Sequence, residues 1–298
     1  MDILSFNSVS SLSLNEINFA LAESESMSIL TDSDKTVDSL YKIFIGKSQY
    51  NGSIQALSME CREYPAVMRQ LCGFVNNSVG VYEDSTVKFN IIVYSQYCGF
   101  KREDIESRVH LLLKKIGLWE FRDILVRKID TVSKLKLRII LACMHSPKLL
   151  FLFDVFKDFE REELEDIFNF FDYLKKNEKL SFVNITTNSD CCLPNESTYI
   201  IVNGKTKAYG LPSKIIAENS LKDLAVIKTV DSQLSYDGEY QKNKDGSFSI
   251  SISDGENISD IIKKVVLGGN QVVSANLKSV TLEDVFRFYC EAEKEGEY

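Results

Sequence analysis

The chain contains little glycine: 14 of its 298 residues are glycine, where about 7% is usual for a protein. Loops that hold phosphate groups are built from glycine, because its missing side chain lets several backbone N–H groups converge on one anion. The scarcity of glycine therefore weighs against a phosphate-binding loop of the ordinary glycine-rich kind.

The sequence also lacks the features of membrane-spanning, secreted and zinc-binding proteins. Its longest apolar runs, such as Leu149–Phe153, are far shorter than the roughly 18–20 residues that cross a bilayer. No N-terminal segment pairs a basic region with an apolar one, so we expect no secretion signal. The seven cysteines show no CxxC spacing, which favours buried, reduced thiols over disulfides or a metal site. The net charge of −8 argues against a nucleic-acid partner.

What the sequence does contain is an alternation of helix and strand patterns. Strands are predicted at residues 26–30, 149–153, 181–185 and 199–202. Amphipathic helices are predicted around residues 40–45, from 101 to 116 before Gly117, at 137–144 and at 162–175. Residues 149–153 are apolar on both faces, as expected of a central parallel strand with helices on each side. This alternation indicates an α/β sheet.

Two smaller predictions concern single segments. Asn51–Ser53, with the letters NGS, predicts a turn that precedes a short strand. The chain has only two histidines, His110 and His145, and we expect both to be ordinary helix residues without a catalytic role.

The chain changes character near residue 220. Residues 246–255 alternate apolar residues with serine, which is typical of a strand with one face in water. A helix with an apolar stripe over residues 258–266 is expected to end at Gly268-Gly269, and a further strand follows in residues 271–277. Thr281 is a plausible N-cap for a closing helix. These patterns predict a small α+β module.

The order of these segments resembles the ATP-binding subunit of ABC transporters, in particular exporter-type subunits whose C-terminal extension ends in a LEDVF-like helix. The likeness is best in segments that do not take part in catalysis. They are residues 72–91 for the surroundings of the Q-loop, 97–118 for the first part of the helical subdomain, 145–154 (HSPKLLFLFD) for the approach to the Walker B strand, 200–210 for the strand pair after the switch histidine, and 281–286 (TLEDVF) for the last helix of the extension.

The resemblance implies an α/β, P-loop-NTPase-like ABC ATPase fold over residues 1–220, with a helical subdomain at about 85–135. A C-terminal α+β accessory module would then occupy residues 221–298. The resemblance also indicates which positions of this sequence correspond to the ATP-binding and catalytic motifs of the family. The residues at these positions can then be compared with the motifs.

In the family, a G-x-x-G-x-G-K-[ST]-[ST] loop holds the ATP phosphates. Its place falls on residues 31–39 (TDSDKTVDS), which contain no glycine. The gapless alignment puts Val37 at the lysine, whereas a shift by two residues offers Lys35-Thr36 as a Lys-[Ser/Thr] pair. A carboxylate 4 Å from a phosphate charge costs roughly 4 kcal/mol at an effective dielectric constant of 20, and three aspartates surround this pair. The degenerate nucleotide-binding equivalents are Lys35, Thr36, Val37, Asp38 and Ser39.

The family's LSGGQ signature, which closes on a partner's ATP, falls on residues 129–133 and retains neither glycine. Its remaining equivalents are Asp130, Thr131, Val132 and Ser133. Asp130 replaces the serine that would donate to the γ-phosphate, and an ionised carboxylate only accepts hydrogen bonds. A register that places Val132-Ser133 on Leu-Ser restores no glycine either.

The Walker B pair of the family is an aspartate that holds Mg²⁺ followed by a glutamate that polarises water. Spacing from Pro147 puts Phe153 on the aspartate and Asp154 on the glutamate. A slip by one residue makes Asp154 the metal ligand and puts Val155 in place of the base. One member of the pair is missing in either register.

Three further positions complete the set. Asn77 takes the place of the Q-loop glutamine, Asn188 that of the switch histidine, and Glu160 keeps the acid of the D-loop. Because so many catalytic motifs are lost together, we expect a chain that keeps the ABC ATPase fold but does not hydrolyse ATP. No metal ligand and no cofactor is predicted.

The sequence therefore favours a catalytically impaired subunit that acts as a structural or regulatory partner. It is expected at the cytoplasmic face of a membrane permease, paired with an intact ATPase subunit or with itself. One alternative is an unorthodox Mg-ATP-binding or ATP-hydrolysing subunit that uses Lys35, Thr36, Asp38 and Asp154. A second alternative is a soluble interaction protein unrelated to transport.

Overall fold

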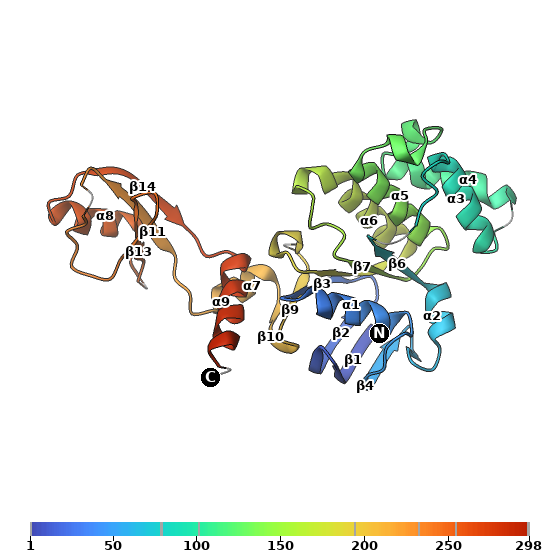
Figure 1. Ribbon diagram of the computed structural model, residues 1–298, viewed down its shortest axis with the longest axis horizontal. Helices are drawn as coiled ribbons and strands as arrows, with labels where there is room; N and C mark the ends of the chain where they lie inside the picture. The colour runs from blue at the N-terminus through green and yellow to red at the C-terminus, as the bar shows by residue number, and fades with distance from the viewer. Residues whose placement is uncertain are drawn as a thin grey trace. The chain divides into compact units, whose positions relative to one another are not determined.

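The computed structural model describes residues 2–77, 80–100, 102–193, 195–231, 233–253 and 255–296 (Figure 1). The chain divides into two compact units. The first contains the residues up to Pro212 together with those from Tyr289 onward, and the second is Ser213–Phe288. Within the described ranges, no helix is both long enough and apolar enough to cross a membrane.

A six-stranded sheet in the order β10-β9-β3-β8-β7-β6 forms the centre of the first unit. All its strands are parallel except β10, which pairs antiparallel with β9 at one edge. The strands are β3 (Ser26–Thr31), β6 (Cys72–Asn76), β7 (Leu149–Phe153), β8 (Ser181–Thr186), β9 (Ser197–Val202) and β10 (Lys205–Gly210). The four strands predicted from the sequence are confirmed, and the α/β class with them.

Strand β7 shows why its sequence is apolar throughout. Leu149, Phe151 and Phe153 belong to one hydrophobic core, whereas Leu150 and Leu152 belong to the other. Successive side chains of a strand point to opposite faces, and both faces of this sheet are covered. The prediction of a central parallel strand is therefore confirmed.

The two faces of the sheet are covered differently (Figure 1). The α-helices of the first unit are α1 (Asp34–Phe44), α2 (Pro65–Leu71), α3 (Val87–Tyr97), α4 (Arg102–Lys115), α5 (Thr131–Cys143) and α6 (Glu165–Glu178). The short 3-10 helices are η1 (Trp119–Phe121), η2 (Val126–Lys128), η3 (Arg161–Leu164) and η4 (Ser189–Cys191). Helices α3 to α6 share one core, and α1 shares the other with a second sheet. The predicted helices are confirmed, although α5 begins six residues earlier than the sequence indicated.

The second sheet of this unit is antiparallel, in the order β2-β1-β4-β5. Its strands are β1 (Asp2–Ser11), β2 (Leu14–Ala22), β4 (Asn51–Ala56) and β5 (Met59–Glu60). The prediction of a turn at Asn51–Ser53 is wrong, because these residues open strand β4. Gly52 has φ +85° and lies against the backbone carbonyl of Ser8, where the pairing of β1 with β4 shifts register. The glycine thus serves a β-bulge and not a turn.

Only one of the two histidines is a helix residue. His110 lies in α4, where its ring meets Trp119 edge-on at 4.4 Å between centroids. His145 lies beyond the end of α5, so the prediction for it is wrong. Ser146 with φ +52° and Pro147 after it turn the chain toward β7, and neither geometry continues a helix.

The second unit is a small α+β module with its own core. Its antiparallel sheet has the order β12-β13-β11-β14. The elements are α7 (Pro212–Glu218), β11 (Leu224–Thr229), β12 (Gln241–Lys242), β13 (Phe248–Ser251), α8 (Ile258–Leu267), β14 (Val272–Lys278) and α9 (Leu282–Glu295), whose last residues belong to the first unit. Phe248 and Ile250 of β13 pack with Ile261 and Val265 of α8. The hydroxyl of Thr281 accepts from the Asp284 N–H at 3.2 Å, which confirms it as a cap.

Candidate functional site

The connection between β3 and α1 consists of two residues, Asp32 and Ser33. Three N–H groups of the first helical turn donate to Ser33: that of Lys35 to its hydroxyl at 3.1 Å, and those of Thr36 and Val37 to its carbonyl oxygen at 2.9 and 3.3 Å. The first N–H groups of a helix are the ones that an anion binds. Here the N-cap serine uses two of them, those of Lys35 and Thr36, while the Val37 N–H makes the first regular bond of the helix.

The five equivalents of the phosphate loop have separate environments. Val37 is packed in the core, and Thr36 is only 2% exposed although it lines the cleft beside the turn. Asp38 forms an exposed ion pair with Lys42 at 2.6 Å, and the Ser39 hydroxyl lies 3.3 Å from that of Ser11. Lys35 is exposed as well, and it is the cation of this group that adjoins the turn.

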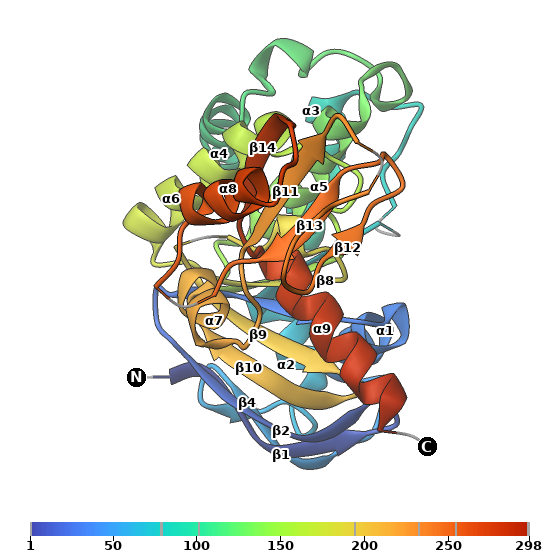
Figure 2. The same ribbon diagram turned by 90° about the vertical axis from the view of Figure 1, so that its left-hand side faces the viewer.

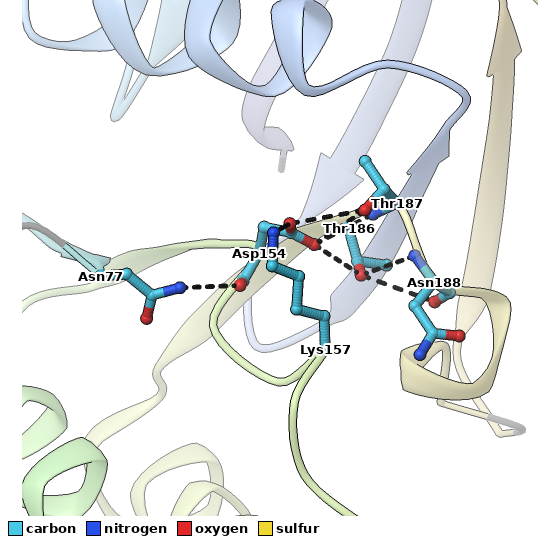
Figure 3. A network of polar contacts seen from close by, with 6 residues as sticks. All are labelled: Asn77, Asp154, Lys157, Thr186, Thr187 and Asn188. Atoms are coloured by element: carbon cyan, nitrogen blue, oxygen red, sulfur yellow. Dashed lines mark hydrogen bonds and ion pairs between the residues drawn. The ribbon is translucent and has the colours of Figure 1, made fainter. Parts of the chain in front are cut away.

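Asp154 lies directly after β7, in a left-handed conformation with φ +52°. Its side chain is only 9% exposed, and its N–H donates to the Ile185 carbonyl at 2.7 Å. Carboxylate oxygen Oδ1 accepts from the hydroxyls of Thr186 and Thr187 and from the Thr187 N–H, at 3.1 to 3.3 Å. The other oxygen, Oδ2, lies 2.7 Å from the Lys157 ammonium (Figure 3).

The donors are distributed unevenly over the two carboxylate oxygens, each of which offers about two lone-pair sites. Oδ1 faces the Thr186 hydroxyl and both donors of Thr187, whereas Oδ2 faces the Lys157 ammonium and, at 3.4 Å, the Thr187 hydroxyl. The hydrogen bond and charge of Asp154 raise the pKa of Lys157, and Asp34 and Asp158 act in the same direction. Lys157 thus supplies the positive charge that this carboxylate faces.

Asn77 and Asn188 lie on either side of Asp154 (Figure 3). The Asn77 side-chain amide donates to the backbone carbonyl of Asp154 at 3.3 Å. Asn188 donates its N–H to the Thr186 hydroxyl at 3.1 Å, while its own side chain accepts from the Asp190 N–H at 2.9 Å as the N-cap of η4. The structure therefore brings Asn77, Asp154 and Asn188 together: Asn77 bonds Asp154 directly, and Asn188 is linked to it through the Thr186 hydroxyl.

The signature equivalents start helix α5 and make local contacts. Asp130 is its N-cap and accepts from the N–H and the hydroxyl of Ser133, at 2.8 and 2.9 Å. Burial opposes the charged form, but these hydrogen bonds, with Lys136 nearby, lower the pKa of Asp130 overall. In the described part of the chain, no hydrogen bond or ion pair joins residues 130–133 to Asp154.

Glu160 also has a capping role. It is the N-cap of η3 and forms a capping box with Glu163, in which each side chain accepts from the other residue's N–H. Glu160 lines a cleft of about 600 Å³ with Lys157 and Asn188. The acid is thus exposed at the rim of a cleft that adjoins the Asp154 network.

A second cleft, of about 520 Å³, adjoins the β3–α1 turn, and we name it the hydroxyl cleft. It is lined by Ser10, Ser11, Leu12, Ser13, Leu14, Asn15, Asp32, Ser33, Lys35, Thr36, Asn203 and Gly204. None of these twelve residues is aromatic, so the cleft offers hydrogen bonds and one ammonium but no ring on which a base would stack.

Three members of the Asp154 network were not predicted from the sequence: Lys157, Thr186 and Thr187. The spacing of Asp154 and Lys157 by three residues is visible in the sequence, but it is meaningful only if the chain turns sharply after β7. Thr186 ends strand β8 and Thr187 follows it; because β8 pairs with β7, only the strand order places them beside Asp154.

Replacing Asp154 tests how much the network stabilises the fold. We expect Asp154→Ala to lower the free energy of unfolding by about 1–3 kcal/mol, because it leaves several buried donors unpaired. Asp154→Asn keeps an oxygen acceptor and tolerates the left-handed backbone, so its loss should be smaller. Urea unfolding measures both. Two variants as stable as the parent would contradict a structural role for this carboxylate.

The Asp130 cap gives a prediction with a pH dependence. Asp130→Ala should cost about 1 kcal/mol of stability at pH 7, whereas Asp130→Ser, another good N-cap, should cost much less. Because the folded-state pKa is lowered, the contribution is complete above the unfolded value of about 3.9 and is lost as pH falls through the folded value. Urea midpoints of Asp130→Ala and the parent should therefore keep a constant difference from pH 7 to about pH 4 and approach each other only at lower pH.

Solved structures with the same architecture are ATP-binding subunits of ABC transporters, although no family model matches the chain. One is cbiO1 from Clostridium perfringens, described as part of the ABC transporter complex cbiONQ, with 18% identity and a TM-score of 0.66 over 73% of this chain and 91% of that one. Another, an ATP-binding subunit of an ABC transporter, has 18% identity and a TM-score of 0.61 over 72% and 92%. A third, the ATP-binding cassette MJ1267 in its ADP conformation, has 17% identity and a TM-score of 0.61 over 72% and 92%. The chain therefore has the P-loop-NTPase-like fold of ABC ATPases.

Proposed function

We propose that this chain is an ABC-type subunit that does not hydrolyse ATP and acts as a structural or regulatory partner of a membrane permease. The observation that carries the proposal is the environment of Asp154. Four protein donors use its carboxylate, and one of them is the Lys157 ammonium, where an ATPase needs a magnesium ion or an attacking water.

A magnesium ion at Oδ2 would meet this ammonium, which lies 2.7 Å from that oxygen. Hydrated Mg²⁺ gives up its waters reluctantly and prefers carboxylates together with substrate phosphates. Separating Asp154 from Lys157 would leave a largely buried charge without its partner, which is costly. Within the described ranges, no group of three histidine, cysteine or acidic side chains forms an alternative site. The residues present do not fit Mg-ATP.

The β3–α1 turn supports the same conclusion on the phosphate side. A loop that wraps phosphates needs several residues between strand and helix, and this chain has Asp32 and Ser33. The first-turn N–H groups donate to Ser33, and Asp32 adds a negative charge. Its carboxylate is held by the Asn203 N–H at 3.1 Å.

The signature equivalents support scaffolding over shared catalysis. A subunit with a defective phosphate site can still complete a partner's site if its own signature is intact. Asp130 instead directs its carboxylate to the start of α5, and a γ-phosphate brought there would meet a negative charge. Pairing with an intact ATPase subunit, or with a second copy, would then be structural.

An exposed aromatic surface supports a permease as the partner. Tyr82, Phe89 and Tyr97 are 56%, 50% and 80% exposed, and Phe89, Val93 and Tyr97 follow one face of α3 at i, i+4, i+8 spacing. The Asn90 side chain fixes the Tyr82 backbone to α3 through hydrogen bonds of 2.7 and 3.1 Å. The segment that carries this surface resembles in sequence a region that contacts the permease in ABC transporters.

A second candidate function is nucleotide binding without the usual loop. Lys35 favours it, because this exposed lysine lines the hydroxyl cleft and forms no ion pair among the described residues. The other three residues that this alternative requires are engaged or buried: Asp38 pairs with Lys42, Thr36 is 2% exposed, and Asp154 is held by its network. We therefore rank it second.

Titration calorimetry with Mg-ATP separates the two candidates. The proposed function predicts no saturable heat at millimolar nucleotide, since neither phosphate nor magnesium has a free set of ligands. A saturable binding isotherm that disappears in Lys35→Ala would establish the second candidate instead. Lys42→Ala is the matched control, because Lys42 lies on the same helix and is paired with Asp38.

Purification of the tagged protein from its native cells tests the partner. A permease and an intact ATPase subunit are expected to co-purify, and Phe89→Ser with Tyr97→Ser should reduce the permease at least tenfold by removing apolar contact area. Tyr209→Ser is the control, because Tyr209 is also exposed, at 53%, but lies on β10. Recovery of the protein without either partner would contradict the proposal.

A further inference from the structure

The last turns of α9 return to the first unit and contact the β9–β10 turn (Figure 2). The Glu293 carboxylate forms an ion pair with the Lys207 ammonium and a hydrogen bond with the Asn203 side chain. The paired side chains of Lys207 and Glu293 are only 21% and 20% exposed. One carboxylate thus contacts Asn203 in the β9–β10 turn and Lys207 in strand β10.

The same turn forms a wall of the hydroxyl cleft. Asn203 and Gly204 line the cleft, and each ties the turn to another wall. The Asn203 N–H donates to the Asp32 carboxylate at 3.1 Å, and the Gly204 carbonyl accepts from the Asn15 N–H at 2.7 Å. The β9–β10 turn therefore joins the β1–β2 turn, the β3–α1 turn and the end of α9.

The thiol of Cys290, one helical turn before Glu293, also senses the charge of the β3–α1 turn. Burial and then the negative charge of Asp32 raise the pKa of its thiol, so the start of the returning segment lies within electrostatic range of the β3–α1 turn. The geometric support for a seated segment is the Glu293 side chain, which contacts both Lys207 and Asn203, and Cys290 lies one helical turn before it.

We propose that residues 289–296 form a latch, in which the Lys207–Glu293 pair and the Asn203 contact hold the β9–β10 wall of the hydroxyl cleft closed. The latch is a device of the chain itself and does not depend on the proposed pairing with a permease. Because α9 begins in the second unit, a partner that binds the second unit and displaces α9 would release this wall.

The rate at which Cys290 reacts with a maleimide measures the state of the latch. In a Cys98→Ser background, Cys290 is the one cysteine that is not buried, since Cys61, Cys72, Cys143, Cys191 and Cys192 all are. Glu293→Lys and Lys207→Glu should each raise the labelling rate at least fivefold, because release exposes the thiol and removes it from Asp32. The exchanged pair, Lys207→Glu with Glu293→Lys, should recover most of the slow rate.

Two further measurements keep the test decisive. Arg287→Glu breaks an ion pair with Glu283 within α9 itself, so it should leave the labelling rate within twofold of the parent. Hydrogen exchange at the Asn15 and Asn203 amides should accelerate at least fivefold in both single variants, since these amides close the wall. Unchanged labelling and exchange in the single variants, or equal acceleration in Arg287→Glu, would overturn the latch.

Discussion

The carboxylate of Asp154 is the point at which three chain segments meet. Strand β7 delivers it, the end of β8 supplies two threonines, and the turn that follows supplies Lys157. A largely buried charge is stable only when it is paired and hydrogen-bonded, so these segments must keep their positions for the fold to persist. The Lys157 ammonium lies against Oδ2 of this carboxylate, and the proposed loss of catalysis rests on this pairing.

Four of the residues aligned with the motifs of ABC ATPases cap helices in this chain. Ser33 caps α1, Asp130 caps α5, Asn188 caps η4 and Glu160 caps η3. The first N–H groups of a helix need acceptors whether or not a phosphate supplies them. Side chains that satisfy these groups internally stabilise the helices, and they remove the sites to which an anion would bind.

Most of the α/β fold was predictable because its signals are local. Strand β7 is recognisable from its apolar run and α4 from its spacing, and the resemblance supplied the order of the segments. The bulge at Gly52 was not predictable, since it depends on Ser8, more than forty residues away. The role of Lys157 required the left-handed turn at Asp154, and those of Thr186 and Thr187 required the pairing of β7 with β8. Such features belong to the assembled sheet and not to any one stretch of sequence.

The two-residue connection between β3 and α1 also determines how such a site changes over evolutionary time. The gapless alignment gives residues 31–39 as many positions as the family's phosphate loop, but helix α1 already begins at Asp34. A loop that wraps a triphosphate would therefore require the first turn of α1 to unwind. Substitutions to glycine in that turn, which lower helix propensity, are the changes that would open the way to such a loop.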